Sequence, residues 1–212
     1  MENQNHLQTL SEIRALMERS SRFVSLSGIS GVIAGIAALI GAGAMYARLG
    51  LFSNGKLIGS IHQILMQETD ERGLFYFFLT DASLVLFVAL AGAFYFTNRH
   101  SKKRGQSIWS PVSLRLVVNL FVPLVTGAVF CFLLLLHMEI WLIAPSMLVF
   151  YGLGLINGSK YTLEDIRYLG YCQVVLGLVA MSFPNFGLLI WSVGFGVLHI
   201  FYGILMWVKY EK

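Results

Sequence analysis

The sequence predicts an all-α polytopic membrane protein, a bundle of six transmembrane helices with both the N- and the C-terminus in the cytoplasm. Composition is the first reason, because 57% of the 212 residues are hydrophobic and only 12% are charged. A soluble domain carries about 25% charged residues, so lipid must cover much of this surface. The second reason is that the apolar residues gather in six long segments. The third is that Lys and Arg fall mainly on one side of the predicted membrane.

Six segments are apolar and long enough for spans, since about 20 helical residues cross the hydrocarbon core of a bilayer. They cover residues 23–47, 74–97, 112–136, 140–156, 166–182 and 186–208, of which the fourth and fifth are short. Pro184 and Asn185 predict a turn between the last two. We therefore expect a cytoplasmic N-terminal segment (1–22), a transmembrane domain (23–208) and a cytoplasmic tail (209–212).

The distribution of positive charge predicts the orientation, because cytoplasmic segments carry an excess of Lys and Arg. With the N-terminus inside, the cytoplasmic side holds eleven basic residues, namely Arg14, Arg19, Arg22, Arg99, Lys102, Lys103, Arg104, Lys160, Arg167, Lys209 and Lys212. The outer side holds only Arg48, Lys56 and Arg72. This bias requires an even number of spans and predicts a multi-pass membrane protein.

Two polar segments have amphipathic helical patterns. In the N-terminal segment, Thr9 and Glu12 have the spacing of a capping box, and apolar residues repeat at helical intervals from Leu10 to Met17. The second segment, 57–65, follows a turn predicted at Asn54-Gly55. We expect it to lie on the outer membrane surface as an interfacial helix, with a lid over an outward-facing cavity as the alternative.

Small residues recur along three spans at steps that place them on one helix face, which lets helix backbones approach closely in lipid. They are Gly28, Gly31, Gly35, Ala38 and Ala42 in the first span, Gly170, Gly177 and Ala180 in the fifth, and Ser192, Gly196 and Gly203 in the sixth. We expect the neighbours of these faces to belong to the same chain, with a second copy of the chain as the alternative.

The fourth span contains a proline, Pro145, which removes a backbone hydrogen bond and predicts a kink or break. Ser146 is expected to satisfy a freed carbonyl. Broken helices border ligand sites in some transporters, and a plain kink is the other interpretation.

Polar residues inside the spans are the candidates for chemistry, because a charge near the bilayer centre costs about 3 kcal/mol on insertion scales. Asp81 lies about two turns into the second span from the outer side. Its position indicates either ion or proton binding or an interhelical hydrogen bond. His199 shares a face of the sixth span with the small residues. As the side chain that titrates nearest neutral pH, it is a candidate proton relay or pH sensor, or else a satisfied core residue.

Other polar residues extend this hypothesis. Arg115, Asn119 and Thr126 form a stripe on the third span, where Arg115 is expected to reach the headgroups. Asn119 is deeper and is expected to find a partner in Gln173 or in the backbone of the fourth span. Asp81, Asn119, Gln173 and His199 come from four helices, and their convergence on one cavity is the binding-site hypothesis.

No motif identifies a reaction. The chain has no nucleophile elbow, no phosphate-binding loop and no HExxH, so we expect no catalytic residue, no metal site and no cofactor. Cys131 and Cys172 lie singly in apolar segments and are interpreted as small core residues. The net charge of +4 lies in short segments where it orients the protein, so nucleic acid is not an expected partner.

The last third of the chain carries two family resemblances. From Tyr161-Thr-Leu-Glu-Asp-Ile-Arg through Gly194-Phe-Gly-Val-Leu-His-Ile-Phe-Tyr-Gly203 it resembles a family of small six-span membrane proteins from Bacteroidota. Its two glycine-rich helices, joined by a proline turn, also resemble acid-resistance membrane proteins of the HdeD type. The second resemblance implies a stress-linked inner-membrane protein without catalysis. Neither assigns a role to Asp81 or to the basic loop 99–104.

Three function hypotheses follow. The first is a non-enzymatic inner-membrane protein that senses or passes a small solute or proton through a bundle cavity, with Asp81 and His199 as its titratable groups. The second is a membrane-anchored scaffold whose N-terminal helix and cytoplasmic basic face dock a cytoplasmic partner. That face consists of Arg99, Lys102, Lys103, Arg104 and Arg115, and the determination of topology is an alternative role for it. The third is an intramembrane enzyme that modifies lipids. The lipid bilayer is the expected partner, and self-association stays open.

Overall fold

The computed structural model describes residues 27–50, 52–53, 56–57, 71–103, 109–137 and 139–212, and most of these are helical. The helices are α2 (Gly28–Arg48), α4 (Glu71–Lys103), α5 (Pro111–Leu136), α6 (Ile143–Gly158), α7 (Asp165–Ser182), α8 (Gly187–Trp191) and α9 (His199–Tyr210). A π-helix, Ser192–Leu198, joins α8 to α9. The 3₁₀ turns are Ile140–Leu142, Ser159–Tyr161 and Pro184–Phe186. The predicted N-terminal segment (1–22) and Arg104 lie outside the described residues.

Within the described residues, five of the predicted apolar segments each coincide with one helix, and the segment 186–208 coincides with α8, the π-helix and α9 in succession. Among the residues that the structure describes, five stretches are long and apolar enough to cross a membrane, namely Gly28–Arg48, Arg72–Lys103, Pro111–Leu136, Ile140–Tyr161 and Pro184–Tyr210. The sixth helix, α7, has 18 residues and includes Asp165, Arg167 and Gln173, which make it less apolar. The all-helical fold and the presence of helices suited to a membrane are therefore confirmed. The count of six spans and the side on which the termini lie stay predictions.

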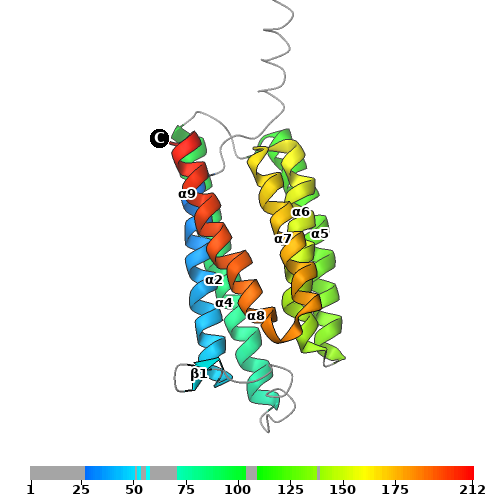
Figure 1. Cartoon of the computed structure of the whole chain (residues 1–212). Helices are drawn as coiled ribbons and strands as arrows, with labels where there is room; N and C mark the ends of the chain where they lie inside the picture. The colour runs from blue at the N-terminus through cyan, green and yellow to red at the C-terminus, as the bar shows by residue number, and fades with distance from the viewer. Residues whose placement is uncertain (1–26, 51, 54–55, 58–70, 104–108, 138) are drawn as a thin grey trace, which may run out of the picture.

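The long helices form two groups (Figure 1), one of α2, α4 and α9 and the other of α5, α6 and α7. In the first half, α2 packs between α4 and α9, and in the second half, α6 packs between α5 and α7. The chain leaves the first half after α4, builds the whole second half, and returns through α8 and the π-helix. The turn predicted between the last two apolar segments is confirmed, because α7 ends at Ser182 and the 3₁₀ turn Pro184–Phe186 leads into α8.

Glycines allow α2 to cross the π-helix and α9 with the backbones in contact. A Cβ atom at Gly35 would lie 2.7 Å from the carbonyl O of Gly196, and one at Gly203 would lie 2.7 Å from the carbonyl O of Gly28. These distances are shorter than van der Waals contact, so a larger residue would force the helices apart. The predicted packing face of the first span is confirmed, and its neighbour is the last helix of the same chain.

The second half uses the same arrangement between α6 and α7. A Cβ atom at Gly152 would lie 2.6 Å from the carbonyl O of Gly170, and one at Gly170 would lie 2.8 Å from the carbonyl O of Gly152. Further along α7, a Cβ atom at Gly177 would lie 2.9 Å from the carbonyl O of Pro145. Each half thus has one glycine-to-glycine helix crossing, as expected where close packing must replace the hydrophobic effect.

The expectation that Pro145 kinks the fourth span is wrong. Pro145 is the third residue of α6, directly after the 3₁₀ turn Ile140–Leu142. A helix tolerates proline in its first turn, because the N–H groups there have no partner within the helix. The expected role of Ser146 is also wrong, since its buried Oγ has no hydrogen-bond partner in the structure.

A short hairpin follows α2. Strands β1 (Phe52–Ser53) and β2 (Lys56–Leu57) pair antiparallel, with Ser53 opposite Lys56. This register brackets the turn predicted at Asn54-Gly55. Leu57 belongs to β2 and not to the interfacial helix predicted for 57–65, because it pairs with Phe52. The rest of that segment lies outside the described residues.

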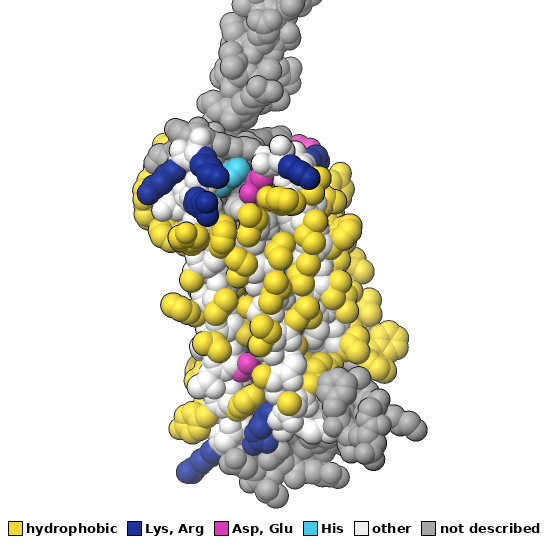
Figure 2. Space-filling model, turned by 90° about the vertical axis from the view of Figure 1, so that its left-hand side faces the viewer, with side chains coloured by type: hydrophobic (Ala, Val, Ile, Leu, Met, Phe, Trp, Pro, Cys, Tyr) yellow, Lys and Arg dark blue, Asp and Glu magenta, His cyan; other side chains and the backbone are white. Residues whose placement is uncertain are grey.

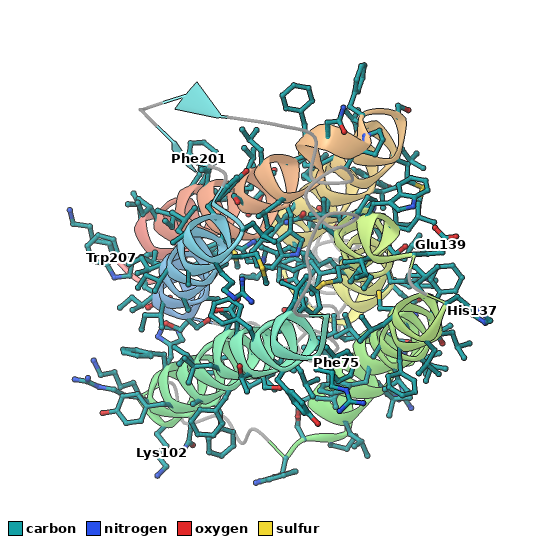
Figure 3. All side chains as sticks on the ribbon, turned by 90° about the horizontal axis from the view of Figure 1, so that it is seen from below. Phe75, Lys102, His137, Glu139, Phe201 and Trp207 are labelled. Atoms are coloured by element: carbon teal, nitrogen blue, oxygen red, sulfur yellow. The ribbon has the colours of Figure 1, made fainter. Side chains whose placement is uncertain are left out.

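Charged side chains concentrate at the two ends of the bundle, and hydrophobic side chains form a broad belt between them (Figure 2). Helices α2, α5 and α7 begin, and α4, α6 and α9 end, at one end of the bundle (Figure 1). We call it the basic end, since it holds Arg99, Lys102, Lys103, Arg115, Lys160, Arg167, Lys209 and Lys212. The opposite end of the described helices has Arg48 and Arg72. Viewed along the bundle, Lys102 and Trp207 point outward from the first half, and His137 and Glu139 lie at the edge of the second (Figure 3).

Candidate functional site

Buried polar groups from α6, α7 and α9 meet at His199, the first residue of α9. His199 is only 6% exposed, and its Nε2 atom lies 2.7 Å from the hydroxyl of Tyr151 on α6. Its Nδ1 atom lies 2.9 Å from the carbonyl O of Gly194 in the π-helix. Gln173 on α7 donates from Nε2 to the same carbonyl at 2.8 Å. We call His199, Tyr151, Gln173 and Gly194 the His199 network.

The hydrogen-bond partners of His199 fix its tautomer. A carbonyl O only accepts, so Nδ1 carries the proton and donates to Gly194. When the imidazole is neutral, Nε2 is then an acceptor, and the Tyr151 hydroxyl donates to it. Gln173 Nε2 lies 3.4 Å from His199 Nδ1, but both atoms are donors, so this approach is not a hydrogen bond. The network therefore gives both ring nitrogens of His199 a hydrogen-bond partner.

The π-helix positions the carbonyl that His199 uses. Hydrogen bonds in a π-helix join residues five apart, and His199 follows Gly194 by that interval. A Cβ atom at position 194 would lie 2.6 Å from Gln173 Oε1 and 2.5 Å from Leu148 Cδ2, so this packing requires glycine. Gln173 Oε1 is buried with no hydrogen-bond partner in the structure. Single π-helical turns occur frequently at functional sites, and leaving a buried acceptor unpaired costs free energy.

Aromatic rings enclose the network on one side. Phe195 stacks on the imidazole of His199, with ring centroids 5.6 Å apart and planes inclined by 12°. The ring of Phe195 also lies 4.9 Å from that of Tyr151 and 5.0 Å from that of Trp191. These contacts restrict both the imidazole and the phenol. The hydrogen bond between Tyr151 and His199 therefore lies in rigid, largely apolar surroundings, where electrostatic interactions are stronger than in water.

Asn119 belongs to a separate polar cluster between α5 and α6. Its Nδ2 donates to the backbone O of Arg115 at 2.8 Å. Asn157 on α6 donates from Nδ2 to the backbone O of Asn119 at 2.9 Å and to its Oδ1 at 3.3 Å. The partner from the fourth span is thus a side chain, and Gln173 bonds to Gly194 instead. Thr126 is exposed and donates only to Val122 of its own helix, at 2.9 Å.

Asp81 lies where α4 packs against α2. Its two carboxylate oxygens would be 3.3 and 3.4 Å from a Cβ atom at Gly41, so this glycine leaves room for the carboxylate. Asp81 is partly buried and makes no hydrogen bond or ion pair in the described part of the chain. Of the four residues expected to converge, the structure brings Gln173 and His199 together and places Asn119 and Asp81 against other neighbours.

At the basic end, α9 is tied to α7. Lys209 donates to the two carboxylate oxygens of Asp165 at 2.8 and 3.1 Å, and the Tyr210 hydroxyl donates to the same carboxylate at 2.7 Å. Burial acts to raise the pKa of Asp165, but the hydrogen bonds from Lys209 and Tyr210 outweigh it and hold that pKa below its usual value. These contacts join the two halves of the bundle.

The next residue, Glu211, closes the first half. Its carboxylate accepts from the backbone N–H of Gly28 and from the hydroxyl of Ser27. An acidic group at this position also interacts favourably with the positive end of the α2 dipole. Glu211 Oε2 lies 3.7 Å from Nδ1 of His100 on α4. The C-terminal residues therefore hold α2, α4 and α9 together.

The described residues hold no metal-type cluster, since no group of three or more His, Cys, Asp or Glu side chains gathers among them. Cys131 and Cys172 are free, and the Sγ of Cys131 approaches the carbonyl O of Ile143 at 3.9 Å. Cys172 is exposed, so its expected place in the core is wrong.

Comparisons with known proteins add no functional evidence. No family model matches the chain, and neither the curated proteins nor the solved structures give a match. The resemblances to a six-span Bacteroidota family and to acid-resistance proteins of the HdeD type stay predictions. Function is therefore inferred from the geometry described above.

The sequence-based predictions missed Tyr151 of the His199 network and Asn157, the partner of Asn119. Tyr151 counts as apolar in a hydrophobic segment, although tyrosine in a membrane helix is typical of the interface. A tyrosine near the middle of the span was therefore a sign that its hydroxyl has a hydrogen-bond partner inside the bundle. Asn157 stands near the end of the same span, where an amide resembles part of a polar loop.

Proposed function

We propose that this chain is a non-enzymatic, six-span protein of the bacterial inner membrane that senses or passes a small solute or proton, with the His199 network at its responsive centre. One observation carries the proposal. His199 is buried within an apolar helical stretch, and both of its ring nitrogens are hydrogen-bonded. Ionisable groups placed inside membrane helices are costly and commonly functional.

The proposed topology draws support from the arrangement of the helix ends. The C-terminus and the start of α2 meet at the basic end, where Glu211 accepts from Gly28. The positive-inside rule places this basic end in the cytoplasm. An even number of spans then puts both termini on the cytoplasmic side. The span count then includes α7, which packs along α6 through Gly152 and Gly170 although it is less apolar than the other helices.

The network supports sensing because it spans the two halves. Tyr151 and Gln173 belong to the second half, and His199 belongs to a helix of the first half. A proton on Nε2 of His199 would turn this atom from acceptor to donor, so Tyr151 would have to change from donor to acceptor. A polar solute that bonds to Nε2 would also displace the Tyr151 hydroxyl. Either event changes a contact between the halves and shifts the balance between two arrangements of them.

Thermal stability of the purified full chain tests the proposal. Melting is measured across pH and against a panel of ions and small polar metabolites, for the wild type, His199→Gln and Tyr151→Phe. A ligand at 100 times its dissociation constant adds about 2.7 kcal/mol, which a melting curve resolves. We expect a pH or ligand response that both substitutions abolish. Tyr151→Phe alone should also destabilise the protein by about 1–3 kcal/mol, since it leaves Nε2 of His199 buried without a donor.

Asp81→Asn is the matched control, because it also removes a titratable group within a membrane helix, and Asp81 does not contact the network. The control should respond as the wild type does. A response lost in Asp81→Asn and kept in His199→Gln would move the centre to the contact between α2 and α4. A wild type that responds to nothing, with variants that behave identically, would reject sensing and solute handling in favour of a scaffold.

A further inference from the structure

The basic residues at the basic end fall into two sets that differ in their partners. In the first set, each cation contacts another group of the protein. Lys209 bonds to Asp165, and Lys160 donates to Asn157 at 3.3 Å. Arg167 donates from Nε to the hydroxyl of Ser159 at 3.4 Å, and the Nζ of Lys212 lies 5.7 Å from the ring centroid of Trp207. These cations are engaged within the fold.

The second set consists of Arg99, Lys102, Lys103 and Arg115. All four side chains are exposed, and none of them makes a hydrogen bond or an ion pair in the parts of the chain that the structure describes. Arg99, Lys102 and Lys103 lie in the last turns of α4, and Arg115 lies in the second turn of α5. Three of these charges therefore lie at the end of α4 and the fourth near the start of α5, and the described part of the protein supplies no anion to any of them.

The surroundings of this set place it at the edge of the hydrophobic belt. Leu114 and Val118, which flank Arg115 on α5, are 61% and 52% exposed. Tyr95, one turn before Arg99, is 59% exposed, and Trp109, just before α5, is 81% exposed. Tyrosine and tryptophan prefer the headgroup level of a bilayer. The free cations thus lie close in the chain to exposed residue types that favour the headgroup level, and Lys102 points outward from the bundle (Figure 3).

We propose that the end of α4 and the start of α5 form a binding surface for anionic phospholipid, with Arg99, Lys102, Lys103 and Arg115 contacting headgroup phosphates. Arginine suits this role because its planar guanidinium binds phosphate in a bidentate manner. Lipid fits better than an acidic cytoplasmic protein, because Arg115 is flanked by exposed apolar side chains that lipid tails cover.

Native mass spectrometry of the detergent-solubilised full chain, titrated with phosphatidylglycerol or phosphatidylcholine, tests this surface. The test variant is Lys103→Gln with Arg115→Gln, and the control is Lys209→Gln with Lys212→Gln. Both variants remove two positive charges from the same end of the molecule, so a general charge effect is equal in the two. Each basic residue near an anionic surface contributes about 1 kcal/mol, so the test variant should bind phosphatidylglycerol roughly 30-fold more weakly than the wild type.

The expected result is preferential binding of phosphatidylglycerol that the test variant loses and the control keeps. The substituted residues of the test variant have no protein partner, so its melting temperature should stay that of the wild type. Equal loss in the two variants would overturn the proposal, because it would show a nonspecific charge effect. Binding of a polyglutamate peptide in place of phosphatidylglycerol would also overturn it, since it would identify an acidic protein as the partner. Equal affinity for the two lipids would reject a preference for anionic headgroups.

Discussion

The close crossing of α2 and α9 at glycine residues predicts that adding a single methyl group would push the two helices apart. In Gly35→Ala, the new Cβ atom would lie 2.7 Å from the carbonyl O of Gly196, 2.7 Å from Cγ1 of Ile200 and 3.0 Å from its backbone N. The Ile200 side chain can rotate away, but the two backbone atoms can move only with α9. Filling a packed interface in this way costs about 1–3 kcal/mol.

Gly43→Ala on the same helix is the matched control, because a Cβ atom there meets nothing within 4 Å. Both substitutions gain the same intrinsic helix propensity, up to about 1 kcal/mol. The difference between the two variants therefore isolates the packing cost at the crossing. Gly43→Ala should match or exceed the wild type in stability, and Gly35→Ala should fall below Gly43→Ala by about 1–3 kcal/mol.

Thermal unfolding in a single detergent, followed by near-ultraviolet circular dichroism at one scan rate, measures this difference. For a chain of this length, each kcal/mol shifts Tm by about 2–4 °C, so Gly35→Ala should melt roughly 2–12 °C below Gly43→Ala. Equal melting temperatures for the two variants would refute the reasoning. They would mean that α2 and α9 do not cross at the separation the structure gives, or that the crossing contributes nothing to stability.

Two further predictions concern polar contacts. Asn157→Leu breaks the hydrogen bonds to Asn119 on α5. It should lower the free energy of unfolding by about 0.6 kcal/mol, the average for a hydrogen bond between membrane helices. In the same melting assay the control Thr126→Val should leave stability unchanged, because Thr126 bonds only within its own helix. The second prediction concerns Asp165, whose pKa in the folded state is held below its usual value by hydrogen bonds. Its carboxylate therefore stabilises the fold at pH values above the unfolded-state pKa of about 3.9. This contribution is lost as the pH falls through the folded-state pKa. In melts between pH 3 and pH 7, Asp165→Asn should remove this acid-dependent part of Tm. The effect should be small, because Lys209 is half exposed. An unchanged acid dependence would mean that the Asp165 carboxylate does not stabilise the fold.

The sequence predicted much of the architecture because membrane helices are specified locally. A helix in lipid satisfies its backbone within its own segment, so the length and apolar character of each segment suffice to locate it. The small residues of the first span were also informative, since a run such as Gly28, Gly31 and Gly35 marks a face for close packing wherever its neighbour comes from. The expectation for Pro145 failed because its effect depends on whether it falls in the first turn or the interior of a helix. Sequence pattern locates helix ends only to within a few residues.

The partners of the polar residues required the tertiary structure. Asp81, Asn119, Gln173 and His199 each lie inside a predicted span, and nothing in their spacing says which spans are neighbours. The structure separates the helices into two halves and so directs Asn119 to Asn157 and Asp81 to Gly41.

The His199 network depends on the same three-dimensional information. Its formation requires Tyr151 and the carbonyl of Gly194, which the π-helix presents to the imidazole. The hydrophobic pattern of each span is a property of its own segment, and the sequence alone determined it. The choice of hydrogen-bond partner is a property of how segments distant in the chain pack together, and only the tertiary structure decided it.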